Sequence, residues 1–582
     1  MKTIFKTLVL LVGIFFFSTT FTSCKEPGDD NPPNPQQNDF SDNFGNAVNR
    51  DFMGKIMDNA HNPISGATVK IGSDTATTDD NGIFIIEDAT VFERFAYVEV
   101  EKSGYLKGSR SLVPTDAMNQ VSIILLDENV VGSVNSGQDS EVNLPNGTTV
   151  KFDGAFKDEN GNAYSGSVSV MMQHLDPSDP DINLKMPGML YAQNADNNER
   201  ALETYGMLNV ELRGSGGEKL NIAEGHTATI EIPVDPAQTN APNTIPLWHF
   251  DEEIGVWVED GQADLIGGKY IGQVSHFSWW NCDAQFPTVT LCMQITDGTN
   301  PVYGVKVELF RANAVYPRVG WSNGNGEICG LIPANESLTM KIIDPCGNVI
   351  STTTIGPFSS DTDLGTVTIP ALQTAVITGT LVDCNNNAVT DGYVILRYGQ
   401  YNELTYTVTN GTFTFTTLSC VANGNFTLEG LDNTGFQTTG IVNFTFTNPT
   451  TNIGNLVACN TITEYITYQI DNDAPIVLVT NISGNYYSQN NTYSVNGSLN
   501  NDFIYISVTA DPGTYNYGND YTMEISPANL DYSQPVNLTA TVNTNPIANT
   551  GEYIDVTFGG TYTDTQGVVR SLTGIAHVIR DN

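Results

Sequence analysis

Short runs that alternate apolar and polar residues dominate this chain from residue 49 onward. Examples are Ala67-Thr68-Val69-Lys70-Ile71 and Thr412-Phe413-Thr414-Phe415. A period of two residues is typical of strands with one face on a core, and Asn-Gly, Asp-Gly and other Gly-rich turns bound the runs. Long amphipathic helices are nearly absent. The pattern therefore predicts an all-β chain built from tandem β-sandwich domains, transthyretin-like or immunoglobulin-like.

Four spaced pieces mark a first domain over about 49–128. They are Gly54-Lys55-Ile56-Met57-Asp58, Pro63-Ile64-Ser65-Gly66-Ala67-Thr68-Val69, Thr78-Asp79-Asp80-Asn81-Gly82-Ile83-Phe84 and Val98-Glu99-Val100-Glu101-Lys102-Ser103-Gly104-Tyr105. Asn81-Gly82 is expected to close a hairpin, and Gly104 is expected to end a strand where a side chain would obstruct the turn. The set resembles the carboxypeptidase regulatory-like domain family, and this resemblance implies a seven-stranded, transthyretin-like sandwich.

Weaker copies of the same pieces follow at Gln294 and at Gly379. The second copy has Met293 where Gly54 stands in the first, and the third copy lacks the proline. Between the first and second copies, residues 129–286 hold four of the five tryptophans, in pieces that end at Val274-Ser275-His276-Phe277-Ser278-Trp279-Trp280-Asn281. This segment resembles astroprincins and cartilage intermediate layer proteins, which implies an extracellular or cell-surface protein without an established enzymatic activity.

The first 23 residues form a secretory signal pattern, with Lys2 and Lys6 before an apolar run from Leu8 to Phe17. Small residues then lead to Cys24, which resembles the lipobox cysteine of bacterial lipoproteins. That resemblance implies cleavage before Cys24 and its acylation; an ordinary signal peptide is the alternative. Residues 24–48 are rich in Pro, Asn and Asp and are expected to be a flexible tether. Its acidic start resembles the signal of Bacteroidetes-type surface lipoproteins, with the periplasmic face of the outer membrane as the alternative location.

The expected organisation has seven parts. They are a signal peptide (1–23), a lipidated cysteine and linker (24–48), a regulatory-like sandwich (49–128), a Trp-containing β-rich domain (129–286), a second regulatory-like sandwich (287–371), a third (372–460) and a C-terminal sandwich (461–582).

Composition narrows the functional classes. The net charge of −41 over 582 residues makes nucleic acid an unlikely partner, because phosphates would be repelled. Seven cysteines lie between residues 282 and 459, and an exported chain meets an oxidising compartment. At least two disulfides are expected, within 292–346 and 384–459, with one thiol left over. The candidate residues are Cys292, Cys329, Cys346, Cys384, Cys420 and Cys459.

Catalytic and metal motifs are weak. His249-Phe250-Asp251-Glu252 matches the H-x-x-E zinc motif, with His276 as a third ligand, but a hairpin histidine beside a polar turn is the favoured interpretation. No catalytic residue, metal ligand or cofactor is therefore predicted. Calcium at the loops Asp79–Gly82 or Asp158–Asn162 remains an alternative.

Exposed aromatic residues are candidates for glycan stacking, namely Trp280, Tyr486 and Tyr487. Trp279 and Trp280 are adjacent and should face opposite sides of a strand. The sequence favours a non-enzymatic outer-membrane lipoprotein with an adhesion, ligand-presenting or structural role, shaped as an acidic rod on a lipid tether. Its expected partners are the lipid bilayer, through acylated Cys24, and an envelope or extracellular protein or a glycan. The alternative is a carbohydrate-binding accessory protein of an outer-membrane glycan uptake system.

Overall fold

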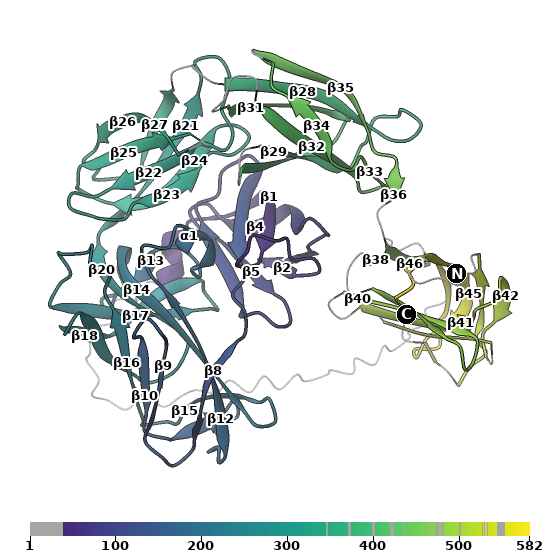
Figure 1. The fold of residues 1–582 in the computed structure, drawn as a ribbon, viewed down its shortest axis with the longest axis horizontal. Coiled ribbons are helices and arrows are strands. Elements are labelled where there is room, and N and C mark those ends of the chain that lie inside the picture. Colours follow the sequence, from purple (N-terminus) through teal and green to yellow (C-terminus); the bar gives the residue numbers. More distant parts are fainter. Residues whose placement is uncertain are drawn as a thin grey trace, which may run out of the picture.

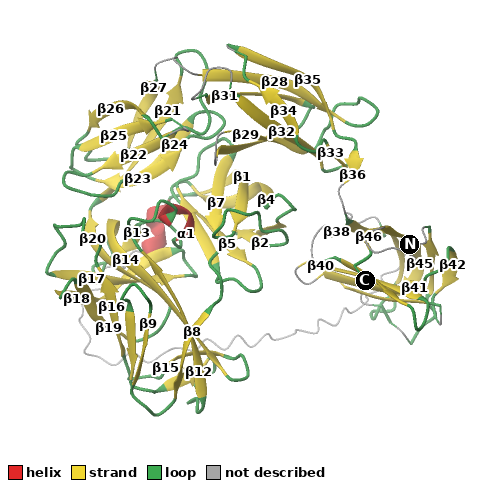
Figure 2. Cartoon of the chain, in the orientation of Figure 1, coloured by secondary structure: helices red, strands yellow, loops and turns green. Residues whose placement is uncertain are grey.

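The protein is described here by a computed structural model, which covers residues 39–344, 347–369, 374–398, 402–419, 424–435, 437–447, 449–461, 464–471, 476–478, 482–499, 502–518, 520–526, 528, 530–531, 533–543 and 553–581. Within these residues the elements are strands, apart from the short 3-10 helix η1 (Phe40–Phe44) and the short helix α1 (Ile182–Lys185) (Figure 2). The predicted all-β fold class is confirmed. The strands form five units, named below by their residues.

Unit 1 (47–124) is a two-layer sandwich. Strand β1 lies between β4, which is antiparallel to it, and β7, which is parallel to it, and the second layer has the order β3-β2-β5-β6. Alternate apolar side chains of both layers meet in one core, including Phe52, Val69 and Val98. The strands are β1 (Ala47–Met57), β2 (Thr68–Ile71), β3 (Asp74–Thr77), β4 (Ile83–Phe92), β5 (Ala96–Glu101), β6 (Gly108–Leu112) and β7 (Asn119–Ile124).

Unit 3 (288–368) repeats this topology, with β21 between antiparallel β24 and parallel β27 and a second layer in the order β23-β22-β25-β26. Its strands are β21 (Thr288–Thr296), β22 (Lys306–Phe310), β23 (Arg318–Trp321), β24 (Glu327–Pro333), β25 (Leu338–Ile343), β26 (Val349–Ile355) and β27 (Thr362–Thr368).

Unit 4 (374–461) has the same central arrangement, with β28 between antiparallel β31 and parallel β35. Its second layer follows the order β30-β29-β32-β33-β36, with β34 also paired to β32. Its strands are β28 (Thr374–Val382), β29 (Gly392–Tyr398), β30 (Asn402–Val408), β31 (Thr412–Leu418), β32 (Asn425–Asp432), β33 (Gln437–Thr438), β34 (Val442–Thr445), β35 (Thr450–Val457) and β36 (Asn460–Thr461). The weak sequence repeats thus correspond to repeated strand orders.

Unit 2 (130–286) is one continuously hydrogen-bonded sheet in which β14 and β20 are central. Its strands are β8 (Val130–Asn135), β9 (Ser140–Asn143), β10 (Thr149–Phe152), β11 (Phe156–Asp158), β12 (Ser167–Leu175), β13 (Tyr191–Gln193), β14 (Glu199–Gly214), β15 (Lys219–Ile222), β16 (Ala228–Pro233), β17 (Thr244–Asp251), β18 (Val256–Ile266), β19 (Lys269–Val274) and β20 (Trp279–Phe286). One of its two cores also contains Leu106, from unit 1, and Leu126, which directly follows unit 1.

Unit 5 (465–579) packs a sheet of order β38-β37-β46-β45-β44-β42 against one of order β39-β40-β41-β43. Its strands are β37 (Tyr465–Ile470), β38 (Ile476–Leu478), β39 (Ser483–Tyr487), β40 (Thr492–Leu499), β41 (Asp502–Thr509), β42 (Gly513–Asn516), β43 (Tyr521–Ser526), β44 (Asn537–Val542), β45 (Tyr553–Thr563) and β46 (Val569–Ile579).

Units 1 to 4 together form a closed arrangement, and unit 5 lies to one side of it (Figure 1). Unit 4 returns to unit 1, where Tyr393, Ile395 and Leu431 of unit 4 share an apolar cluster with Met53 and Ile83 of unit 1. The expectation of an extended rod is therefore wrong for these four units. Side chains more than 300 residues apart in the chain contact each other and close the arrangement.

Candidate functional site

Trp280 is not a surface aromatic residue, which corrects the expectation that it stacks on a glycan. Its side chain is 0% exposed, and that of Trp279 is 3% exposed. The two indoles do face opposite sides of β20, but β20 is hydrogen-bonded on both edges, to β14 and β17. Separate hydrophobic cores cover its two faces. Neither ring therefore has a face available to a ligand.

Tyr486 and Tyr487 lie on β39 in unit 5. Tyr487 is 48% exposed, whereas Tyr486 is half-buried, with the Arg580 guanidinium 4.9 Å from its ring centroid. The Tyr486 hydroxyl also donates a hydrogen bond to Asn491. Of the three predicted aromatic residues, Tyr487 has the most accessible ring, so glycan stacking at this strand remains a prediction carried by Tyr487.

The two histidines of the weak zinc motif do meet. The rings of His249 and His276 have centroids 4.8 Å apart, and both lie against the Trp280 ring. Burial lowers the pKa of each imidazole, which favours the neutral ring. Among the described residues, no group of three or more His, Cys, Asp or Glu side chains is placed to hold a metal ion. The two imidazoles pack against each other and against the core residue Trp280.

The carboxylates of the two candidate calcium loops cap backbone amides. Asp158 accepts hydrogen bonds from the amides of Asn160 and Asn162, and Asp79 accepts them from the amides of Asn81 and Ile83. Such Asx turns use the oxygens that a cation would need. Calcium at these loops stays the alternative to the prediction of no cofactor.

Disulfide bonding is present in units 3 and 4. Cys292 and Cys329 are directly opposite each other on β21 and β24 and form one bridge, and Cys384 and Cys459 form another. Cys282 is a buried free thiol. The remaining candidates, Cys346 and Cys420, and the lipidation candidate Cys24 lie outside the described residues.

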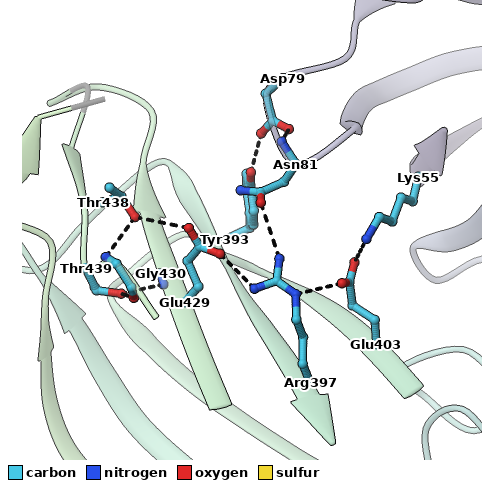
Figure 3. Close-up of polar contacts among 11 residues, drawn as sticks. Lys55, Asp79, Asn81, Tyr393, Arg397, Glu403, Glu429, Gly430, Thr438 and Thr439 are labelled. Atoms are coloured by element: carbon cyan, nitrogen blue, oxygen red, sulfur yellow. Dashed lines mark hydrogen bonds and ion pairs between the residues drawn. The ribbon is translucent and has the colours of Figure 1, made fainter. Parts of the chain in front are cut away.

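A polar network closes unit 4 onto unit 1 (Figure 3). The Tyr393 hydroxyl of β29 donates a hydrogen bond to Asp79, in the turn between β3 and β4. Burial raises the pKa of Asp79 to about 6, so this carboxyl is partly protonated near neutral pH. Burial also raises the pKa of Tyr393, which keeps the phenol protonated as a donor.

Arg397 follows Tyr393 by four residues on β29 and extends this network. Its guanidinium donates to Glu403 at 2.7 Å, to Glu429 at 2.8 Å and across the interface to Asn81 at 3.3 Å. Lys55 of β1 reaches Glu403 from the other side at 2.6 Å. One guanidinium therefore forms ion pairs with two carboxylates of unit 4 and joins them to unit 1, and Lys55 supplies the second positive charge, as Figure 3 shows.

The closed arrangement encloses a cavity of about 910 Å³, a volume within the range of small-molecule sites. Its wall comes from all four units, and α1 of unit 2 contributes to it. Representative wall residues are Arg110 and Asn119 from unit 1, Met186 from unit 2, Trp321 from unit 3 and Phe426 from unit 4. Because no single unit forms this cavity, it exists only when the units are assembled.

Trp321 is the residue that sequence reasoning missed. It is 44% exposed, while the other four tryptophans are at most 3% exposed, and it lies in the cavity wall. The only sequence signal was its separation from the tryptophan-rich segment 129–286. Its position at the end of the edge strand β23 explains its exposure, since no further strand of that layer covers it.

These features define a multidomain β-sandwich protein with a cavity between its units, and no protein-family model matches the chain. Similar curated proteins are cartilage intermediate layer protein 2 of Mus musculus (27% identity, covering 35% of this chain and 19% of that protein) and of Homo sapiens (26%, covering 34% and 18%). Cartilage intermediate layer protein 1 of Sus scrofa is 27% identical over 111 residues. The chain thus spans about a fifth of the length of the curated relatives it matches. The resemblance to these proteins is confirmed over part of the chain.

Solved structures with some likeness are a streptococcal ancillary pilin (15% identity, TM-score 0.13, covering 39% of this chain and 98% of that one) and the major pilin subunit BcpA of Bacillus cereus (9%, TM-score 0.13, 72% and 100%). The pilus adhesin SpaC of Lactobacillus rhamnosus GG in its open conformation has 10% identity and a TM-score of 0.12, covering 70% and 52%. TM-scores this low carry no argument about this chain. Within its described residues, no helix is long and apolar enough to cross a membrane.

Proposed function

We propose that this chain is a non-enzymatic structural or adhesion protein of the cell surface, held at the outer membrane by acylated Cys24. The observation that supports this best is the closure of units 1 to 4 into one body by the contacts of Tyr393, Arg397 and Lys55 with partners in the opposing unit. A closed body resists bending at every joint, which suits a protein that bears load or presents a ligand. The disulfides Cys292–Cys329 and Cys384–Cys459 suit an oxidising, extracytoplasmic compartment.

The alternative, a carbohydrate-binding accessory protein for glycan uptake, has less support. Of its candidate stacking residues, Trp280 is buried in the core of unit 2, whereas the Tyr487 ring is exposed. Stacking of a sugar ring on one isolated tyrosine contributes little affinity without neighbouring partners. A glycan array on the full chain and on Tyr487→Ala separates the two roles: a glycan bound by the first and lost by the second supports uptake, and envelope proteins captured without glycan support the structural role.

The anchor is tested by fractionating cells that express the chain with Cys24→Ser. The variant is expected in the soluble fraction, while the unmodified chain and the matched control Ser23→Ala, which keeps the cysteine, stay with the membrane. Protease added to intact cells should then shorten the membrane-bound forms. A Cys24→Ser chain that remains in the membrane fraction contradicts lipid anchoring, and full protection from external protease contradicts the surface location.

A further inference from the structure

The cavity differs in charge from the rest of the molecule. The chain has 24 Lys and Arg against 65 Asp and Glu, yet the cavity wall holds more cations than carboxylates. Its cations are Lys55, Arg110, Arg318 and Arg397, and its carboxylates are Asp181, Glu327 and Glu403. A cavity wall with one excess positive charge, in a strongly acidic protein, favours a small anion over the outer surface, which repels it.

Glu403 is already neutralised within the wall, because Lys55 and Arg397 both contact it. Asp181 lies 3.0 Å from the His61 ring, and Glu327 accepts a hydrogen bond from Asn323. These contacts leave Arg110 and Arg318 as the cations of the wall that have no carboxylate within ion-pair distance among the described residues.

Arg110 and Arg318 approach the same short segment of unit 2 from different units. Arg110 on β6 donates to the Gly188 carbonyl at 3.3 Å, and Arg318 on β23 donates to the Leu190 carbonyl at 3.2 Å. One residue, Met189, separates these carbonyls, so both guanidinium groups lie against the same short segment of the cavity wall. Arg110 keeps an accessible part of its side chain although it lies deep in the molecule, because that part faces the cavity.

Both guanidinium groups stay charged at neutral pH. Burial lowers the pKa of each to about 10, which is still well above 7. Arg318 is also held in place by the carbonyls of Leu331 and Leu202. Within the described part of the chain, Arg110 donates a single hydrogen bond, to the Gly188 carbonyl, and so keeps most of its donors for a ligand. A buried cation without a counterion is costly, and a bound anion relieves that cost.

The rest of the wall is largely apolar and adaptable. Aliphatic, aromatic and thioether side chains from all four units contribute, and methionine in particular adjusts its shape to varied ligands. They include Met57, Leu112, Met186, Met189, Met293, Leu331 and Phe426.

We propose that the cavity binds an amphipathic carboxylate, whose charged group contacts Arg110 and Arg318 and whose hydrocarbon portion lies against the apolar wall. The charge-assisted hydrogen bonds select the anion, and burial of the chain supplies affinity in proportion to its apolar area. This inference goes beyond a surface structural role, because it assigns a ligand to the space between the units.

Trp321 provides the readout. Since the other tryptophans are buried, quenching of tryptophan fluorescence by acrylamide reports mainly on Trp321. The full chain with Cys24→Ser is titrated with decanoate, with decanol as the uncharged match, with acetate as the charge alone, and with glucuronate as a sugar carboxylate. Decanoate is expected to protect Trp321 at concentrations at least tenfold lower than any of the other three.

Variants locate the binding. Arg110→Gln is expected to weaken decanoate binding about tenfold and to leave decanol binding unchanged, which shows that the cavity is intact. Arg570→Gln, which removes an arginine of unit 5 paired with Asp471 and Asp564, is the control and should change neither. Equal protection by decanol and decanoate, tighter binding of glucuronate than of decanoate, an unchanged decanoate affinity in Arg110→Gln, or no protection by decanoate would each overturn the proposal.

Discussion

At the scale of single residues, Asp79 is the carboxyl of the interface between units 1 and 4 whose pKa is raised by burial. Its carboxyl accepts hydrogen bonds from two turn amides and from Tyr393, yet burial outweighs them and raises its pKa to about 6 from 3.8. The sequence placed Asp79 in the loop Asp79–Gly82, because turn signals are local. It did not predict the burial, because the covering surface comes from residues more than 300 positions later.

The first prediction concerns the pH dependence that Asp79 imposes. A carboxyl whose pKa is raised on folding holds its proton more tightly in the folded state, so its contribution to stability falls as pH rises from about 4 to about 6 and is constant above. With about 1.4 kcal/mol for each pKa unit, the free energy of unfolding loses about 3 kcal/mol over this range. Asp79→Asn should abolish that loss, measured by urea unfolding at pH 4 and pH 7.

The control for this prediction is Asp158→Asn. Asp158 caps the same kind of turn but is exposed, and its hydrogen bonds to Asn162 lower its pKa. Its contribution therefore has the opposite sign and is lost as pH falls. The prediction fails if Asp79→Asn and the unmodified chain lose the same stability between pH 4 and pH 7.

At the scale of elements, the repeated Asn-Gly turn has one structural reason in units 1 and 3. A Cβ on Gly82 would lie 2.4 Å from the Ile56 carbonyl oxygen and 3.1 Å from Pro63, and a Cβ on Gly326 would lie 2.3 Å from the Ile295 oxygen. Both glycines have φ of +73°. The sequence repeat therefore records a close approach of the turn to the end of the first strand of each sandwich. In the third copy Ala388 occupies the position of the proline, and a Cβ on Gly411 would lie 2.8 Å from the Ala388 Cβ and 2.9 Å from the Leu381 carbonyl oxygen.

The second prediction compares Gly82→Ala with Gly104→Ala. Both positions have positive φ, but a Cβ on Gly104 would meet nothing within 4 Å, so the expectation that a side chain there obstructs the turn is wrong. Gly104→Ala should cost about 1 kcal/mol of stability for backbone strain alone, and Gly82→Ala should cost about 2 kcal/mol more because the carbonyl must move. Thermal unfolding of the two variants measures the difference; equal melting temperatures would contradict the role given to the close approach.

Prediction from sequence succeeded for the elements whose signal is local. Period-two alternation and glycine turns predicted strands, and the recurring pieces lie in three sandwiches whose three-stranded layers share one order. The continuous sheet of unit 2 has no such signal. Its central strand β20 pairs with β14 and β17, and two cores built from other parts of the unit bury Trp279 and Trp280 on its opposite faces.

At the scale of the whole molecule, closure decides which surfaces exist. An extended rod would leave Trp321 and Arg110 on open surfaces, whereas the closed arrangement places both in one cavity wall. The sequence could not predict this because the closing contacts, such as those of Tyr393 with Asp79 and Arg397 with Asn81, are few and have no periodicity. Because the cavity wall comes from all four units, opening the interface between units 1 and 4 should change the accessibility of Trp321 on unit 3.

The third prediction tests that linkage. The double variant Tyr393→Ala/Arg397→Ala removes the phenol from the apolar cluster. It also removes the guanidinium that forms ion pairs with Glu403 and Glu429, so these two carboxylates remain as like charges beside the interface. Units 1 and 4 are expected to separate, which increases the radius of gyration in small-angle X-ray scattering and makes Trp321 more accessible to acrylamide. The matched control Tyr487→Ala/Arg570→Ala changes the same residue types in unit 5 and should alter neither signal.

Because Trp321 belongs to unit 3, its response distinguishes opening of the closed body from local disorder in unit 4. If the scattering profile and the quenching both stay unchanged in the double variant, the contacts between units 1 and 4 do not hold the body closed.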